Sequence, residues 1–347
     1  MLTVTPPRDA YGGGVASIRI VRDGVMAGES SSVNVGLQAL EDPAACVWFQ
    51  VDPRELPALA TALGLHHHAV EDAMKTSPGA TEMGQRSKLD RYPGYVFLYL
   101  YRTSLDDKGA LNLAEISVFA SARWVIAVDR VGTFAHRELV ERWNEHPELL
   151  KHGSPALLYA ILDLVVDSHL DTVDSLGDAV DRMEDVLFDG NTDQDDDPRD
   201  LQRLGFSTRK ALVRLRRVAQ PMRELVGGLM RAEEDDPTPI STGMLPYYQD
   251  VYDHVLRVND SIEGLRDLLT TIYETRLAMA DHTLNTVMKK LTGWAAIIAV
   301  PTAVTGFYGQ NVPYPGFLRP AGFWASTVIW VGMSVALFIA FRRRRWL

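Results

Sequence analysis

Two uncharged runs near the end of the chain constrain its fold more than any other feature. Residues 291–308 are eighteen positions without a charge, and residues 322–341 are twenty. As helices they would be about 27 and about 30 Å long, close to the thickness of a bilayer core. Thirteen residues separate the two runs. The pattern predicts a membrane hairpin, with a first span at 291–308, a loop at 309–321 and a second span at 322–341.

Basic residues indicate how such a hairpin crosses the membrane. Lys289 and Lys290 precede the first run, whereas the loop between the runs carries only Arg319. A basic tail at 342–347 follows the second run and contains Arg342, Arg343, Arg344 and Arg345. Because basic residues are retained on the cytoplasmic side, we expect both termini to be cytoplasmic and the loop to be extracytoplasmic, in a cell (inner or plasma) membrane.

Composition narrows the class of the remaining chain. Its 347 residues suggest one large or two medium domains, and Cys46 is the only cysteine, which excludes an intramolecular disulfide and fits a reducing cytosol. The first twenty residues lack the apolar core of a signal peptide. A net charge of −10 argues against non-specific nucleic-acid binding. No Gly-x-x-x-x-Gly-Lys-Ser/Thr motif occurs, so ATP is not indicated as a cofactor.

Residues 1–150 are expected to form a cytoplasmic α/β domain. Residues 1–43 are weakly periodic, and we predict a loose start with one short strand at 17–21. Apolar, β-branched and aromatic runs predict buried strands at 45–51, 95–101, 113–120 and 124–128. Helical patterns occupy 53–63, 66–74 and 133–143.

Residues 151–235 predict an antiparallel helical hairpin. One long helix begins at Ser154-Pro155 and a second at Pro198. Aspartates recur along the first helix in steps of three and four, which places them on one face: Asp163, Asp167, Asp171, Asp174, Asp178, Asp181 and Asp185. We expect this face to pair with arginines of the second helix.

Residues 245–307 predict one long stalk helix that includes the first span. Apolar residues alternate in steps of four and three, as in a coiled-coil seam: Val251, Val255, Val258, Ile262, Leu265, Leu269, Ile272 and Met279. The helix would be roughly 95 Å long. A single chain is not expected to bury so long a seam, so the pattern predicts an oligomer. The hairpin itself fits either a membrane anchor or part of a pore; small and hydroxyl residues on one face of the first span favour the pore.

Four stretches, taken in order, resemble the CorA family of divalent-cation channels. They are N-x-V-M-K-K-L-T from Asn285, A-V-P-T from Ala299, Y-G-x-N from Tyr308, and a second span that ends in basic residues and Trp-Leu. Residues 70–72 and 250–254 also match, so the resemblance covers about residues 45–347. The family signature is Tyr-Gly-Met-Asn, and here Gln310 replaces the methionine. The loop after Asn311 also lacks an acid that many members carry, which leaves the ion and the transport direction open.

The resemblance implies an α+β cytoplasmic domain and a long helical stalk that continues into a two-helix transmembrane hairpin, assembled as a homopentameric funnel. It implies a pore lined by Asn285, Met288, Leu291, Ala299 and Thr302, and Thr292 lies on the same helical face. Gly309, Gln310 and Asn311 would form the pore mouth, where a ring of Asn carbonyls accepts hydrogen bonds from a hydrated ion. The other interpretation of Gly-Gln-Asn is a helix-ending turn.

The resemblance also implies a regulatory Mg²⁺ site. Asp72 and Asp250 match positions that bind Mg²⁺ between neighbouring subunits, and Glu71 and Asp253 are the adjacent alternatives. Either aspartate on its own fits a solvated or helix-capping residue equally well. For the aspartate face of the first long helix, the resemblance offers a second interpretation, in which these acids face the basic collar of residues 342–345.

Together these features predict a transporter and not an enzyme. The main hypothesis is a passive channel for Mg²⁺, with Co²⁺ and Ni²⁺ as further candidates, driven by the membrane potential and gated by cytosolic Mg²⁺. Its partners would be copies of itself, the lipid bilayer and divalent cations. The alternatives are a zinc transporter resembling the ZntB branch, and a membrane-anchored oligomer that senses ions without transporting them.

Overall fold

The computed structural model describes residues 16–75, 85–129, 136–189, 198–231, 240, 243–310, 313, 316–317 and 319–347. The chain divides into two compact units, Met1–Leu269 and Thr270–Leu347. The long helix α7 (Leu245–Tyr308) contributes its first part to the first unit and its second part to the other.

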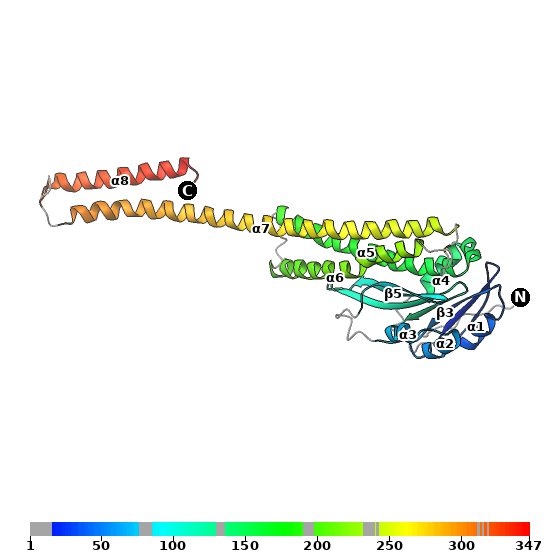
Figure 1. Ribbon diagram of the computed structural model, residues 1–347. Coiled ribbons are helices and arrows are strands. Elements are labelled where there is room, and N and C mark those ends of the chain that lie inside the picture. Colours follow the sequence, from blue (N-terminus) through cyan, green and yellow to red (C-terminus); the bar gives the residue numbers. More distant parts are fainter. Residues whose placement is uncertain are drawn as a thin grey trace. The chain divides into compact units, whose positions relative to one another are not determined.

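The described part of the first unit contains a mixed seven-stranded sheet (Figure 1). Its strands are β1 (Ser17–Arg22), β2 (Val25–Ser30), β3 (Ala45–Val51), β4 (Lys88–Tyr92), β5 (Tyr95–Leu105), β6 (Leu111–Ala120) and β7 (Trp124–Asp129). Their order is β2-β1-β3-β7-β6-β5-β4. The pair β3–β7 is parallel, with Val47 opposite Trp124, and the other five pairs are antiparallel. The four strands predicted at 45–51, 95–101, 113–120 and 124–128 are confirmed.

Helices lie against both faces of this sheet (Figure 1). They are α1 (Val33–Ala39), α2 (Leu56–Leu63), α3 (His67–Met74), α4 (His136–Glu145), the 3₁₀ helix η1 (Pro147–His152), α5 (Ser154–Asp189) and α6 (Pro198–Met230). Side chains of a strand alternate between faces. Accordingly Phe97 belongs to the apolar cluster that contains Leu56 and Leu59 of α2, whereas Leu98 belongs to the cluster that contains Ile161 of α5.

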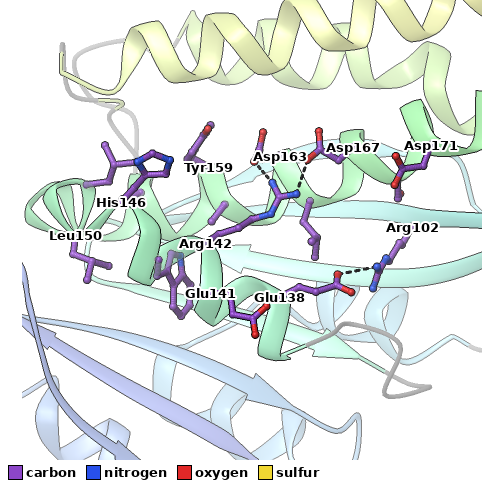
Figure 2. Close-up of a pocket in the computed structure, with 16 residues that line it drawn as sticks. Arg102, Glu138, Glu141, Arg142, His146, Leu150, Tyr159, Asp163, Asp167 and Asp171 are labelled. Atoms are coloured by element: carbon purple, nitrogen blue, oxygen red, sulfur yellow. Dashed lines mark hydrogen bonds and ion pairs between the residues drawn. The ribbon is translucent and has the colours of Figure 1, made fainter. Parts of the chain in front are cut away.

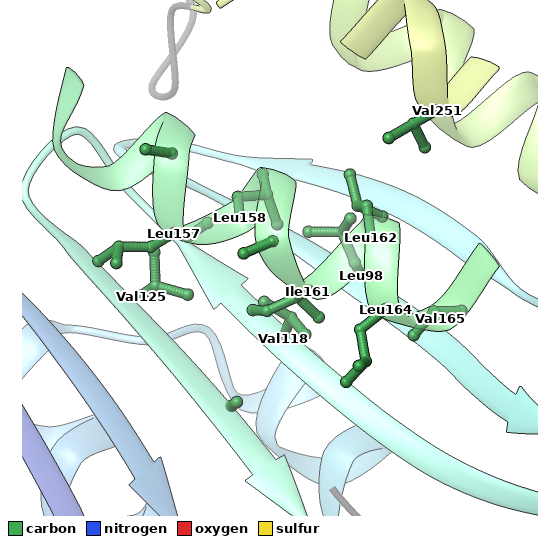
Figure 3. Close-up of a cluster of buried hydrophobic side chains, with 14 of the residues drawn as sticks. Leu98, Val118, Val125, Leu157, Leu158, Ile161, Leu162, Leu164, Val165 and Val251 are labelled. Carbon is green, nitrogen blue, oxygen red and sulfur yellow. The ribbon is translucent and has the colours of Figure 1, made fainter. Parts of the chain in front are cut away.

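The contact between α5 and the sheet is the centre of the first unit (Figure 3). Fully buried residues of α5 recur every four positions, at Leu157, Ile161 and Val165. They belong to one cluster with Leu98, Val118 and Val125 of β5, β6 and β7. Because this stripe of α5 faces the sheet, the positions offset from it by two, such as Asp163 and Asp167, lie on another side of the helix.

The beginning of the chain is more ordered than predicted. The strand expected at 17–21 is confirmed as β1, but the segment described as a loose start also forms β2 and α1. β2 escaped notice because its residues are mostly exposed, which leaves no apolar alternation to detect. α1 lies so close to the sheet that a Cβ at Gly36 would be 2.4 Å from the ring of Phe49. β4 was also missed, since KLDRY has too few apolar residues to read as a strand.

The apolar seam of α7 corrects one prediction. Val251, Val255, Val258, Ile262 and Leu269 are buried within a single chain. The first two share a cluster with α5, and Val258 and Ile262 share one with Leu212 and Leu215 of α6. The expectation that one chain cannot bury this seam is therefore wrong up to Leu269, because the two helices before α7 cover it. Beyond that point Leu277, Met279 and Leu284 are exposed in the isolated chain.

The second unit consists of the rest of α7 and of α8 (Pro320–Arg343). By length and composition, both α7 and α8 are able to cross a membrane. The two helices lie side by side, with the ring centroids of Trp294 and Phe338 6.4 Å apart. At Gly293 a Cβ would lie 3.5 Å from the side chain of Leu347, so the last residue of the chain packs against α7.

The buried stripe of α5 gives a stability prediction. Ile161→Ala should lower the free energy of unfolding of the first unit by about 2–5 kcal/mol, because it removes buried methyl groups and leaves a cavity. Ile161→Val, the matched control, should cost about 0.5–1.5 kcal/mol. The measurement is denaturant unfolding of the full chain in detergent, followed by tryptophan fluorescence. Equal losses for the two variants would contradict the close packing of this contact.

Candidate functional site

The six residues expected to line a pore all lie on α7. They are Asn285, Met288, Leu291, Thr292, Ala299 and Thr302. At about 100° per residue they fall within an arc of about 120° on the helix surface. Each is exposed in the isolated chain. They therefore form one continuous helical face that is open to another chain, to lipid or to water.

The hydroxyl groups on this part of α7 are bonded within their own helix. Thr302 donates to the carbonyl oxygen of Ile298 at 3.1 Å, and Thr305 donates to that of Pro301 at 2.7 Å. Pro301 lies inside α7, which continues through it to Tyr308. Such back-bonding lets a polar side chain sit in an apolar helix without an unsatisfied donor.

The residues expected at the pore mouth lie directly after α7. The N–H of Gly309 donates to the carbonyl oxygen of Thr305 at 2.8 Å, and the N–H of Gln310 donates to that of Phe307 at 3.3 Å. A Cβ at position 309 would come within 3.1 Å of the Thr305 oxygen, so glycine suits this position. Asn311 lies outside the described residues. Gly309 and Gln310 thus end the helix, which is compatible with both interpretations of the motif.

The expected basic collar lies at the end of α8. Arg342 and Arg343 are in its last turn, Arg344 is its C-cap, and Arg345 has a φ of 56°. All four side chains are exposed. The chain then turns back: the N–H of Trp346 donates to the carbonyl oxygen of Phe341 at 2.9 Å, and the two rings stack.

Asp72, the first expected regulatory residue, lies on α3 in a network of ion pairs. Lys88 of β4 donates to its Oδ2 at 2.7 Å, and Lys75 donates to its Oδ1 at 3.1 Å. Lys88 also lies 2.6 Å from Asp90, and Lys75 lies 3.3 Å from Glu71. Burial alone would raise the pKa of Asp72, but hydrogen bonds from Lys88, Lys75 and Gln85 lower it to about 2. This carboxylate is therefore ionised throughout the physiological range.

Asp250, the second expected regulatory residue, lies in the first turns of α7. Its Oδ1 is 4.0 Å from Nε2 of His254, one helical turn later. Asp253, the alternative residue, accepts a hydrogen bond from Gln249 at 3.0 Å. Within one chain, Asp72 and Asp250 have different neighbours. The prediction that they share an ion concerns two different chains of an assembly.

A second group of charged residues connects α4, α5 and α7. Arg142 of α4 forms ion pairs with both Asp163 and Asp167 of α5 (Figure 2). Nδ1 of His254 lies 4.0 Å from Asp167 and is buried with no hydrogen-bond partner among the described residues. Burial raises the pKa of Asp163 to about 6, although the charge of Arg142 opposes part of this rise. The group borders a cavity of about 500 Å³, lined also by Arg102, Glu138 and Tyr159.

This group also has the donor set of a cation site. One ligand atom each from Asp163, Asp167 and His254 lie within 4.8 Å of one another. Two carboxylates and an imidazole suit a divalent transition metal better than Mg²⁺, which prefers oxygen ligands. Arg142 supplies the positive charge in the structure, so a metal ion would have to replace it.

Sequence reasoning missed this group and gave its aspartates a different partner. Asp163 and Asp167 were expected to pair with arginines of the second long helix, but their partner is Arg142 of α4. Arg216 of that second helix, α6, pairs instead with Glu263 of α7 at 2.9 Å. The sequence did contain a pattern that could have indicated this group. Asp163 and Asp167 on one predicted helix, and Asp250 and His254 on another, are each four residues apart and so share a helical face.

Comparisons with known proteins identify the family. The family described as CorA-like Mg²⁺ transporter protein matches residues 44–343. A cobalt/magnesium transport protein, CorA, of Thermotoga maritima is 27% identical over 291 residues, which are 82% of this chain and 77% of that protein. The protein of the same name from Methanocaldococcus jannaschii is 28% identical over 255 residues, which are 72% of this chain and 77% of that one.

A solved structure has the same fold. The complete structure of the CorA magnesium transporter from Methanocaldococcus jannaschii matches with a TM-score of 0.72 at 18% identity, covering 97% of this chain and 100% of that one. This agreement confirms the predicted fold: a mixed sheet domain, a long helix and apolar helices at the C-terminal end. Since the family match spans the sheet domain, α7 and α8, the chain belongs to the CorA-like Mg²⁺ transporter family, a family of transporters and not of enzymes.

Proposed function

We propose that this protein is a passive transporter of divalent cations, with Mg²⁺ as its main substrate and Co²⁺ and Ni²⁺ as further substrates. The observation that carries the proposal is the family match over residues 44–343, which includes both apolar helices. The names of the two CorA relatives, cobalt/magnesium transport proteins, support the choice of ions. The drive is the membrane potential, about 4.6 kcal/mol for a dication at 100 mV.

The pore in this proposal is built from several copies of the chain, five by the family resemblance. Two helices of one chain cannot enclose a channel, so α7 of each copy must contribute one wall. The exposed face from Asn285 to Thr302 supports this role because Thr292, Ala299 and Thr302 on it have small or hydroxyl side chains, which leave room for an ion. Gln310 and Asn311 would ring the mouth with amide oxygens, which accept hydrogen bonds from the water around the ion.

A second candidate is transport of a transition-metal ion such as Zn²⁺. The observation that favours it is the group Asp163, Asp167 and His254, since an imidazole ligand suits Zn²⁺ and Co²⁺ more than Mg²⁺. Both candidates are tested by the same flux experiment.

Flux through purified protein in liposomes tests the function. With a fluorescent ion reporter inside and a membrane potential imposed, we expect Mg²⁺ influx that does not need ATP or a pH gradient. Asn311→Ala should reduce this flux to background, because the mouth loses its ring of asparagine amide oxygens while the apolar core is unchanged. Gln310→Met, which restores the usual family triplet, should preserve or raise it.

Two experimental results would replace the proposed function with one of its alternatives. Flux of Zn²⁺ but not Mg²⁺, dependent on a pH gradient, would establish the second candidate. Absence of flux for every ion, with oligomers intact by size-exclusion chromatography, would leave a membrane-anchored ion sensor. Normal transport by Asn311→Ala would remove the mouth from the mechanism.

The orientation in this proposal places both termini in the cytoplasm. The basis is the basic collar at Arg342–Arg345 together with Lys289 and Lys290. A tag at either terminus should be inaccessible to protease added outside intact cells, and a tag inserted between the two apolar helices should be accessible. Cleavage of both terminal tags would reverse the orientation.

Regulation in this proposal depends on Asp72 of one copy and Asp250 of its neighbour. Without an ion nothing joins the two carboxylates across the interface, and bound Mg²⁺ bridges them and favours the closed state. A shift of the closed population from about 1% to about 99% needs roughly 5.5 kcal/mol, or about 1 kcal/mol at each of five interfaces. That is a modest demand on an ion shared by two carboxylates.

The double variant Asp72→Asn with Asp250→Asn tests this regulation. It removes two charges and keeps the side-chain size, so it should lose Mg²⁺-dependent protection from protease. It should also conduct at Mg²⁺ concentrations that silence the parent. Replacing the alternatives, Glu71→Gln with Asp253→Asn, serves as the matched control and should retain protection. Unchanged protection in the Asp72/Asp250 variant would make both residues ordinary surface carboxylates.

A further inference from the structure

Each carboxylate oxygen of Asp72 already has a cationic partner within the chain. Lys88 donates to Oδ2 at 2.7 Å and Lys75 donates to Oδ1 at 3.1 Å. An ion that binds Asp72 must therefore approach a carboxylate whose two oxygens each contact an ammonium group. A dication at that position would be repelled by both.

The two lysines are not equivalent. Lys75 follows α3 directly, its side chain is 55% exposed, and its pair with Asp72 spans only three residues of sequence. Such exposed pairs contribute little. Lys88 comes from another element, β4, and its side chain is 32% exposed. Its ammonium lies 5.5 Å from the ring centroid of Phe97, and this cation–π contact also holds the ammonium in place. Burial lowers the pKa of Lys88, but hydrogen bonds to Asp72 and Asp90 raise it overall.

Lys88 also has a second carboxylate partner, with which it would stay paired if it lost Asp72. Asp90 lies 2.6 Å from its ammonium, two positions along the same strand. If an ion took Asp72, Lys88 would stay paired with Asp90 and no buried charge would be left alone. The exchange is therefore accessible, in contrast to the strong cost of stranding a charge.

Asp250, in contrast to Asp72, is mostly exposed to solvent. Its side chain is 62% exposed, against 20% for Asp72. Among the described residues its ion-pair partner is His254, at 4.0 Å. The two carboxylates of the proposed regulatory site thus differ: Asp250 offers an exposed negative charge, whereas the charge of Asp72 is balanced inside its own chain.

We propose that Lys88 is a tethered counter-ion that a divalent cation must displace from Asp72, so that Lys88 determines the Mg²⁺ concentration at which the protein closes. This inference rests on the regulatory role proposed above for Asp72. It assigns Lys88 as a positioning residue: it holds Asp72 ready and ionised, and it competes with the ion for the same oxygen.

The experiment measures the Mg²⁺ concentration that gives half-maximal protection from protease, using the full-length protein in detergent. Lys88→Met removes the ammonium and keeps the length of the side chain. We expect the midpoint to fall about tenfold, since a charge-assisted hydrogen bond no longer opposes the ion. Lys88→Gln, which remains polar, should shift it in the same direction, and Lys88→Arg should leave it near that of the parent.

Three controls separate competition from other effects. Lys108→Met removes the same charge from an exposed turn away from Asp72, so its midpoint should equal that of the parent. Asp72→Asn added to Lys88→Met should abolish the tenfold shift, because the competition acts through that carboxylate. Thermal unfolding without Mg²⁺ measures whether a variant has lost stability. Such a loss would lower the melting temperature and would not by itself shift the Mg²⁺ midpoint of protection.

The outcomes distinguish this inference from the proposed function. If the Asp72/Asp250 double Asn variant loses protection and Lys88→Met and Lys88→Gln keep the parental midpoint, the counter-ion role is wrong and the regulatory site stands. If the double Asn variant keeps its protection, the regulatory site fails and the role of Lys88 fails with it. A midpoint that falls equally in Lys108→Met would reduce the effect to net charge and also overturn the inference.

Discussion

The first unit depends on the burial of the beginning of α7 against the two helices that precede it. Val251, Val255, Val258 and Ile262 are almost completely removed from solvent by α5 and α6. Burial of apolar area at about 25 cal/mol per Å² is the main driving force available to hold a helix in place. After Leu269 the apolar side chains of the same helix, such as Leu277, Met279 and Leu284, are exposed in the isolated chain. One continuous helix therefore has two kinds of surroundings, a protein core at its start and another environment beyond it.

Local periodicity explains why much of the fold was predictable. The buried strands at 45–51 and 95–101 carry long apolar runs, and the helix that begins at Leu245 has no proline between Pro246 and Pro301. Such patterns report which residues are buried, but they do not report against what. The seam of α7 illustrates the limit: its apolar face was correctly recognised, whereas its partners, α5 and α6, were mistaken for further copies of the chain. β2 and α1 were missed because an exposed edge strand and a short helix have no clear period.

The arrangement of the candidate site residues was predictable only within a single helix, where spacing along the chain determines which residues share a face. Helical spacing alone shows that the residues from Asn285 to Thr302 share one face, whereas their expected role in lining a pore comes from the family resemblance. The pairing of Asp72 with Lys88 does not, because it joins a helix to a strand sixteen residues away. The same holds for Arg142, which reaches Asp163 from another helix. Both cases follow one physical rule: a half-buried carboxylate requires a cation, and this chain supplies a basic side chain from a neighbouring element.

Pro301 has a consequence for what can surround the first apolar helix. A proline nitrogen carries no hydrogen, so the helical ladder cannot provide a donor for the carbonyl oxygen four residues earlier, at Ile297. The hydroxyl groups nearby, on Thr302 and Thr305, donate to other carbonyls, those of Ile298 and Pro301. Hydrocarbon offers nothing to an unpaired carbonyl, at a cost of several kcal/mol. By helical spacing Ile297 lies about 180° around α7 from the centre of the face that runs from Asn285 to Thr302, so a polar partner for its carbonyl oxygen would have to come from the other side of the helix.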